Sequence, residues 1–237
     1  MKTTYQKQNS SLITTLLIGI SFVLLSCNNQ SQDDYSYEEK NEIFNSITLE
    51  TDRNKSNEEW KDNMYRNYKY KFRLTFPDSN KDYKISEDIT ISDWEYLKGD
   101  GKEILAKSIN REYGITISTL VKHLPTNNEP SYTIWDNSIS DFEKIFKEGL
   151  KLQNIKPKNL SIEKGSLFNF NAYIVSFNAD ISTGDETIEY FSKTIQTIID
   201  NKVYNVSIIL PTVVWEHEEM QNIFRDVVWS YRFEKAI

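Results

Sequence analysis

Two histidines, His123 and His217, are the first candidates for chemistry in this 237-residue sequence. His217 stands among Glu216, Glu218 and Glu219, and an imidazole with carboxylates is a ligand set that a metal ion accepts. Side chains at consecutive helical positions point in different directions, however, so these residues do not converge on one ion. We therefore expect no metal site and no cofactor, and we interpret the segment as an acid-rich helix start.

The usual signatures of a catalytic nucleophile are also missing from the sequence. No serine lies in a G-x-S-x-G element, which a hydrolase of that type needs. Gly99-Asp100-Gly101-Lys102 lacks the spacing of a Walker A loop and precedes a strand-like pattern, so we interpret it as a hairpin turn. Since no set of acid, base and nucleophile can be named, we expect no catalytic residues and no enzymatic activity.

The one cysteine, Cys27, directly follows an N-terminal segment with the layout of an export signal. Lys2 and Lys7 are its only charged residues, and an apolar run of 14 residues spans positions 12–25. That run is shorter than the ~20 residues of a stable membrane-spanning helix. A chain with one cysteine forms no internal disulfide, so the exported domain must be stabilised by its core.

Leu24-Leu25-Ser26-Cys27 resembles the lipobox of bacterial lipoproteins. The resemblance implies that residues 1–26 are a signal peptide and that Cys27 carries acyl chains, such as palmitate, through a diacylglyceryl group. Two or three acyl chains give a lasting membrane anchor. We therefore expect a lipid-anchored protein of the bacterial cell envelope, in the outer membrane. Two alternatives are an uncleaved N-terminal anchor and an ordinary signal peptide with an incidental cysteine.

Residues 27–59 are rich in Asn, Gln, Ser, Asp and Glu and contain too little apolar surface to fold alone. We expect them to form a flexible acidic tether. Within it, Gln32-Asp33-Asp34 resembles the short acidic signal that sends some lipoproteins to the outer face of the outer membrane. In so acidic a segment the match also arises by chance, which leaves the leaflet open.

The charge balance limits the kinds of partner. The chain has 28 basic and 35 acidic residues and a formal charge of −7, which becomes −9 without Lys2 and Lys7 of the leader. An acidic surface is repelled by the phosphate backbone, so we expect no nucleic-acid partner. The negative charge is most simply a means of keeping the protein soluble.

Residues 60–237 are long enough for one domain with its own core. Alternation of apolar and polar residues predicts a strand over 68–76, extended pieces near 93–97 and 103–109, and a strand over 115–124. Four more strands are expected at 160–164, 171–179, 187–199 and 203–210. The last three are separated by turn residues and so form an antiparallel meander.

Two helices complete the pattern. Apolar residues three and four apart predict one helix over 139–153, with Ser140 and Glu143 as a capping box, and a second over 215–229. Strands and helices in this order predict an α+β fold, with an antiparallel β-sheet packed against helices as an α/β/α-type layered sandwich.

Several local features together resemble the PsbP-like superfamily over residues 68–233. They are an early strand that ends in Phe76-Pro77, Trp94 after it, an entry at 165–172 into a long strand, and a terminal helix closing on Ser230-Tyr231-Arg232-Phe233. The superfamily includes the lumenal photosystem subunit and bacterial lipoproteins of the DcrB type. The resemblance implies a PsbP-like, DcrB-type domain that acts as a non-enzymatic binding, assembly or chaperone module.

Aromatic residues are the remaining candidates for a partner surface. Trp135 precedes the first helix without a core pattern to explain it, and Trp229 and Tyr231 lie at the end of the last helix. We expect a protein partner, together with the membrane that the lipid on Cys27 enters. The alternative is an envelope protein that binds a small or lipidic ligand in a groove between sheet and helix.

Overall fold

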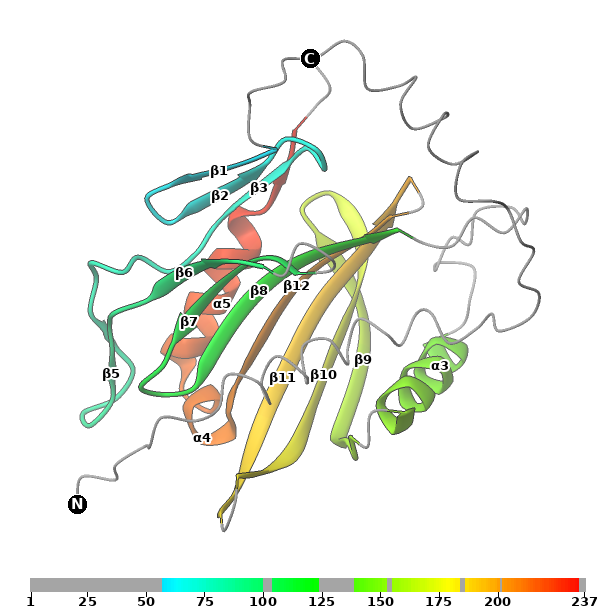
Figure 1. Ribbon diagram of the computed structural model, residues 1–237. Helices are drawn as coiled ribbons and strands as arrows, with labels where there is room; N and C mark the ends of the chain where they lie inside the picture. Colours follow the sequence, from blue (N-terminus) through cyan, green and yellow to red (C-terminus); the bar gives the residue numbers. More distant parts are fainter. Residues whose placement is uncertain are drawn as a thin grey trace, which may run out of the picture.

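A computed structural model describes residues 57–99, 104–123, 139–152, 155–183, 186–200 and 202–234 (Figure 1). Its main element is an antiparallel sheet of seven strands in the order β6-β7-β8-β12-β11-β10-β9. The strands are β6 (Glu95–Lys98), β7 (Ile104–Asn110), β8 (Ile115–His123), β9 (Lys158–Leu167), β10 (Phe170–Thr183), β11 (Glu186–Ile199) and β12 (Lys202–Pro211). The predicted antiparallel meander is confirmed as β10-β11-β12, and β9 extends it.

A second, smaller sheet of four strands was not expected. It contains β1 (Glu58–Lys61), β2 (Met64–Asn67), β3 (Phe72–Thr75) and β13 (Arg232–Phe233), in the order β1-β2-β3-β13. Strand β1 begins at Glu58, slightly before the predicted start of the domain at residue 60. A third pair, β4 (Tyr83–Lys84) and β5 (Thr90–Ile91), forms a short hairpin.

The prediction of one continuous strand over 68–76 is wrong. Residues 68–71 form a turn, in which the Asn67 side chain accepts a hydrogen bond from the Tyr70 backbone N–H at 2.9 Å and Lys71 has a φ of 54°. A left-handed residue reverses the direction of the chain. Two short strands, β2 and β3, consequently replace one long strand.

Three helices are described, α3 (Ile139–Leu152), α4 (Thr212–Trp215) and α5 (Glu218–Ser230). The predicted helix over 215–229 is interrupted, because His217 adopts an extended conformation at the N-terminal cap of α5. The predicted apolar stripe of that helix is confirmed, and its members Met220, Ile223, Phe224 and Val227 are all buried. No helix among the described residues has both the length and the apolar character needed to cross a bilayer.

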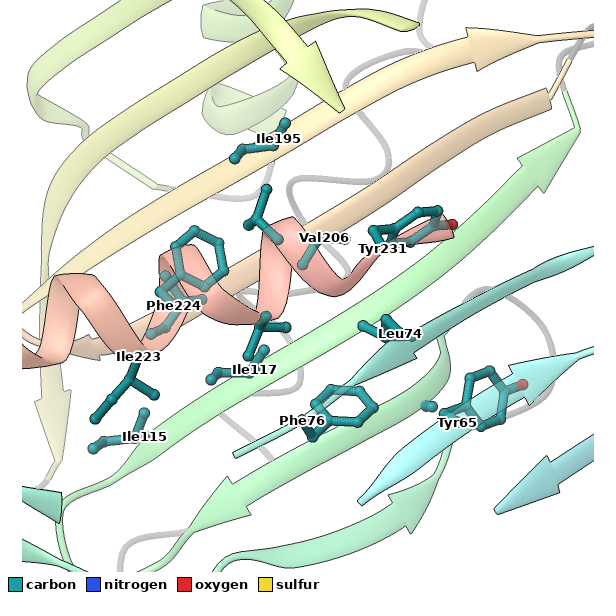
Figure 2. Close-up of a cluster of buried hydrophobic side chains, with 14 of the residues drawn as sticks. Tyr65, Leu74, Phe76, Ile115, Ile117, Ile195, Val206, Ile223, Phe224 and Tyr231 are labelled. Carbon is teal, nitrogen blue, oxygen red and sulfur yellow. The ribbon is translucent and has the colours of Figure 1, made fainter. Parts of the chain in front are cut away.

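The larger core lies between α5, the small sheet and one face of the seven-stranded sheet. Figure 2 shows Ile223 and Phe224 of α5 facing Ile117 and Val206 of the sheet. Tyr231, Leu74 and Tyr65 extend this core toward the small sheet.

A second cluster occupies the opposite face of the seven-stranded sheet, where Phe146 and Leu150 of α3 pack beside Val175 and Phe177 of β10. The α+β class and the antiparallel sheet are confirmed. The α/β/α-type sandwich is met only in part, because helices are few and the layer that contains α5 also contains the small sheet.

Candidate functional site

A groove with a volume of about 1050 Å³ lies between α5 and the hairpin that joins β9 to β10. Its floor includes Lys193 and Ile195 of β11, and one wall is the outer side of α5 with Arg225 and Trp229. Phe168, at the tip of the hairpin, belongs to the opposite wall. We call this feature the α5 groove.

Three cationic side chains of the α5 groove each lie over an aromatic ring of the same groove. The Arg225 guanidinium is 4.8 Å from the ring centre of Trp229, and the Arg232 guanidinium is 5.2 Å from that of Phe168. The Lys193 ammonium is 5.6 Å from the ring centre of Trp215. Such pairs hold a cation in place through the negative face of the ring.

None of the three cations lies within salt-bridge distance of a carboxylate of a described residue. Elsewhere on this acidic surface such pairs are common. The Lys158 ammonium, for example, is 2.7 Å from an oxygen of Asp180 and 3.2 Å from one of Glu189, and these hydrogen bonds raise the pKa of Lys158. The α5 groove therefore presents positive charge that the described domain does not neutralise.

The local structure explains how these residues meet. Arg225 and Trp229 are four residues apart on α5, so they are neighbours on one helix face. Arg232 donates hydrogen bonds to the backbone carbonyls of Trp229 and Tyr231, which fixes its direction just beyond the helix. Phe168 has a φ of 55° in the tight turn between β9 and β10.

Trp215 is held on the floor side by aromatic packing. Its ring stacks on Phe191 with centroids 4.5 Å and planes 13° apart, and it meets Phe224 edge-on at 6.3 Å. Offset stacking of this kind fixes ring orientation. The groove thus combines rigid aromatic surfaces with guanidinium groups, whose N–H edges can bind carboxylate or phosphate in pairs.

The residues predicted as a partner surface fall in different environments. Trp229 is 62% exposed and lines the α5 groove, whereas Tyr231 is completely buried and so belongs to the core instead of the surface. Trp135, Cys27 and the acidic signal Gln32-Asp33-Asp34 lie outside the described residues.

The groove residues Lys193, Arg225, Arg232 and Phe168 were not predicted from the sequence as site residues. A signal for part of the groove was present, because Arg225 and Trp229 have helical i,i+4 spacing. Phe168 comes from the turn between β9 and β10 and Lys193 from β11, and only the sheet pairing brings them to the same groove.

Neither histidine forms part of a cluster of metal ligands in the described ranges, in which no group of three or more His, Cys, Asp or Glu side chains converges. His217 is the N-terminal cap residue of α5. His123 lies beside the Tyr70 ring, and burial together with Lys202 and Lys69 lowers its pKa.

A second unusual feature is on the face of the sheet opposite α5. Seven uncharged polar side chains, each at most 5% exposed, form what we call the polar patch: Thr116, Ser118, Ser192, Thr194, Gln196, Asn205 and Ser207. They occupy neighbouring positions, since Ser207 pairs with both Ser118 and Thr194 in the sheet register.

Hydrogen bonds satisfy only part of the polar patch. Thr194 Oγ1 donates to Ser207 Oγ at 3.1 Å, and Ser207 Oγ donates to Asn205 Oδ1 at 2.6 Å. Ser118 Oγ, Ser192 Oγ and Gln196 Nε2 are buried and have no hydrogen-bond partner in the part of the chain that the structure describes. An unsatisfied buried polar group costs roughly 1–3 kcal/mol.

Comparison with known proteins gives only distant structural similarities. No family model matches the chain, and no curated protein sequence matches it. The solution structure of the cyanobacterial PsbP (CyanoP) from Synechocystis sp. PCC 6803 is similar with a TM-score of 0.45 at 10% identity, covering 79% of this chain and 99% of that chain.

Two further solved structures show lower scores. LpqN of Mycobacterium tuberculosis, described as involved in cell envelope biogenesis, has a TM-score of 0.41 at 11% identity and covers 69% of this chain and 83% of its own. A protein from Bacteroides thetaiotaomicron VPI-5482 has a TM-score of 0.35 at 12% identity, covering 70% of this chain and 46% of its own. These similarities include a protein of the superfamily that the sequence resembles, and at such scores they carry no conclusion about family or function.

Proposed function

We propose that this protein is a non-enzymatic interaction module of the bacterial cell envelope that binds a protein partner through the α5 groove. The observation that carries the proposal is the set of three cation–aromatic pairs in one groove, none of them neutralised by a described carboxylate. Trp and Arg are the residue types that dominate binding energy at protein interfaces.

The exposure of Trp229 supports this role. Its side chain is 62% exposed, although a large apolar ring gains about 25 cal/mol for each Å² removed from water. Phe168, at 38% exposure, adds apolar surface on the other wall. A partner that covers both rings would gain apolar contact and meet N–H groups of Arg225 and Arg232, of which Arg232 already uses Nη1 to hold the backbone carbonyls of Trp229 and Tyr231.

A small or lipidic ligand is the second candidate. The groove volume of about 1050 Å³ is similar to that of sites for small molecules, roughly 300–1,000 Å³. Saturable thermal stabilisation by one compound, lost in a Trp229→Ala variant, would favour this alternative over a protein partner.

An enzymatic role receives no support from the groove. Among the described residues its lining contains one carboxylate, Glu218, and neither histidine nor cysteine, the residue types that most often activate or serve as a nucleophile. We therefore assign the groove to binding.

Anchoring by lipid on Cys27 and location in the outer membrane complete the proposal. They are supported by the lipobox-like sequence Leu24-Leu25-Ser26-Cys27 and by the basic, apolar leader before it. The anchor would restrict the domain to the membrane surface, where a membrane-bound partner is concentrated.

In-cell crosslinking of the full-length protein, followed by affinity purification and mass spectrometry, tests the proposed function. A partner crosslinked to residues around the groove should be lost in Trp229→Ala and retained in Tyr68→Ala, which alters an aromatic residue that is 44% exposed and belongs to the turn after β2. Retention of every crosslinked protein in Trp229→Ala would contradict the proposal.

A further inference from the structure

We infer that the α5 groove binds a segment of its own chain, residues 33–39, with the sequence Asp-Asp-Tyr-Ser-Tyr-Glu-Glu. The inference rests on the proposed function of the groove as a binding site and names its occupant. The segment precedes the described domain and lies within the acidic region after Cys27.

Charge complementarity is the first argument. The segment carries four carboxylates in seven residues, whereas Lys193, Arg225 and Arg232 of the groove have no carboxylate partner among the described residues. A guanidinium that lies over a ring can still direct N–H groups sideways to a carboxylate. In Arg232 both hydrogen bonds to the backbone carbonyls come from Nη1, which leaves the Nε and Nη2 side of the group to face a carboxylate. Glu218 is the one acidic residue among the described residues of the lining, so these residues together carry a positive net charge.

Aromatic complementarity is the second argument. Tyr35 and Tyr37 are two residues apart, and in an extended chain such residues point to the same side. The groove offers two partly exposed rings, Trp229 at 62% and Phe168 at 38%. Tyrosines that pack against these rings would cover apolar surface while neighbouring carboxylates reach the cations.

The chain is long enough for the segment to reach the groove. Between Tyr37 and Glu58, the first residue of β1, an extended chain spans at most about 75 Å. The groove also adjoins the small sheet, because Arg232 lines the groove and begins β13, which pairs with β3. A covalent link of this kind raises the local concentration of the segment to roughly the millimolar range.

The docked segment would compete with any partner for the same cations and rings. A partner must then carry enough acidic and aromatic surface to displace residues 33–39. The segment would therefore set the minimum affinity that a partner needs to occupy the groove. The alternative occupant, an anionic membrane surface, is disfavoured because the chain has a net charge of −7 and would be repelled by it.

Site-specific photocrosslinking in the full-length chain tests the inference. A photoreactive amino acid at Ser36, in the middle of the segment, should crosslink to groove peptides containing Arg225, Trp229 or Phe168. The same probe at Asn45 is the positional control. Each exposed charge pair contributes only modestly, so two cations are reversed together. The double variant Arg225→Glu and Arg232→Glu should lower the yield of the Ser36 crosslink at least about fivefold. Unchanged circular dichroism verifies that the double variant is folded.

Mixing chains labelled with ¹⁴N and ¹⁵N separates the sources of a crosslink. Crosslinks within one isotope support docking of the chain's own segment, whereas mixed-isotope crosslinks show docking onto a second copy and overturn the intramolecular form. Crosslinks from Ser36 that spread over the surface, or that persist in the double variant, overturn the inference.

A tether variant distinguishes this inference from the proposed function. Tyr35→Ala, Tyr37→Ala, Glu38→Gln and Glu39→Gln together remove the docking chemistry but keep Asp33 and Asp34 of the export-like signal. We expect this variant to capture more partner than the wild-type chain.

If Ser36 gives no groove crosslinks but Trp229→Ala still loses the partner, the inference fails and the proposed function stands. If groove crosslinks form but Trp229→Ala leaves partner capture unchanged, the proposed function fails and self-docking stands.

Discussion

The rings of Phe72 and Tyr231 stack with centroids 5.0 Å apart and planes only 5° apart. Phe72 lies in β3 and Tyr231 directly follows α5, and both side chains are completely buried. This stack joins the small sheet to the end of the helix that forms a wall of the α5 groove. The position of the groove wall therefore depends on the packing of the small sheet.

Phe72→Ala should lower the free energy of unfolding by about 3–5 kcal/mol, because it removes a buried ring and leaves a cavity beside Tyr231. Urea unfolding followed by circular dichroism measures this loss. Tyr68→Ala, at an exposed position of the adjacent turn, should change stability by no more than about 0.5 kcal/mol. Equal effects of the two substitutions would show that the stack does not anchor the small sheet.

The small sheet illustrates what sequence periodicity can and cannot predict. Alternation correctly marked Phe72, Leu74 and Phe76 as buried, but it also ran through Tyr68 and Tyr70, where the backbone turns. The spacing of apolar residues predicts which residues face the core. It does not predict that a residue such as Lys71 adopts a left-handed backbone conformation. A two-residue strand such as β13 is too short to produce any period at all.

The polar patch allows a matched pair of substitutions. Ser207→Ala should cost roughly 1–3 kcal/mol, because it removes the acceptor of Thr194 and the donor to Asn205 inside the sheet. Ser192→Ala, on the same face, should be neutral or stabilising, since its buried hydroxyl has no hydrogen-bond partner among the described residues. Thermal unfolding of both variants tests the ranking, and a larger loss for Ser192→Ala would contradict it.

The same patch shows why burial was harder to predict than strand position. Ser192, Thr194 and Gln196 alternate with apolar residues, which is the usual pattern of a strand with one face in water. Their strand was predicted correctly, yet these residues are at most 3% exposed. Alternation identifies two different faces, and only the packing of other parts of the chain decides whether the polar face is covered.

Two glycines, Gly99 just after β6 and Gly165 within β9, should respond very differently to alanine. A Cβ at Gly99 would lie 1.8 Å from the backbone oxygen of Ile104, whereas a Cβ at Gly165 would meet the flexible end of the Ile174 side chain at 2.5 Å. Backbone cannot move aside as a side-chain tip can, so Gly99→Ala should cost about 1–3 kcal/mol or more and Gly165→Ala clearly less. Chemical denaturation of the two variants provides the comparison, and equal costs would mean that the β6–β7 connection readily shifts.

Tyr204 provides a prediction at alkaline pH. Burial, with smaller effects of Asp200 and Tyr70, raises the pKa of Tyr204 to about 12. In the unfolded chain the tyrosine hydroxyl loses its proton near pH 10. The contribution of neutral Tyr204 to the free energy of unfolding is therefore fully present below pH 10 and is lost as the pH rises toward 12.

The Tyr204→Phe variant should therefore lose less stability than the wild-type chain between pH 10 and 12, by at most about 2–3 kcal/mol. Burial also raises the pKa of Tyr65 and Tyr231, so the variant should retain part of the alkaline dependence. Urea unfolding at a series of pH values measures the difference, and parallel curves for the two proteins would show that Tyr204 titrates alike in the folded and unfolded states.

The α5 groove marks the limit of prediction for the candidate site. Trp229 was identified from its place at the end of a helix, whereas Phe168 in the β9–β10 turn and Lys193 in β11 are far away from it in sequence. Tyr231, two residues from Trp229, points into the core because the chain leaves the helix there in an extended conformation. Helical spacing cannot predict side-chain direction beyond the residue at which the helix ends.

The predicted lipid anchor on Cys27 can be tested directly, and the predicted location in the cell envelope depends on it. Cys27→Ala should abolish incorporation of labelled palmitate, and the protein should no longer partition with membranes, because acyl chains supply the affinity at ~0.8 kcal/mol for each buried methylene. Ser31→Ala, four residues later, is the matched control and should remain with the membrane fraction until detergent is added.

A Cys27→Ala protein that is processed normally and still sediments with membranes would show that another part of the chain, or a membrane-bound partner in the α5 groove, holds it there. Combining Cys27→Ala with Trp229→Ala separates these cases, since only attachment through the groove would then be lost.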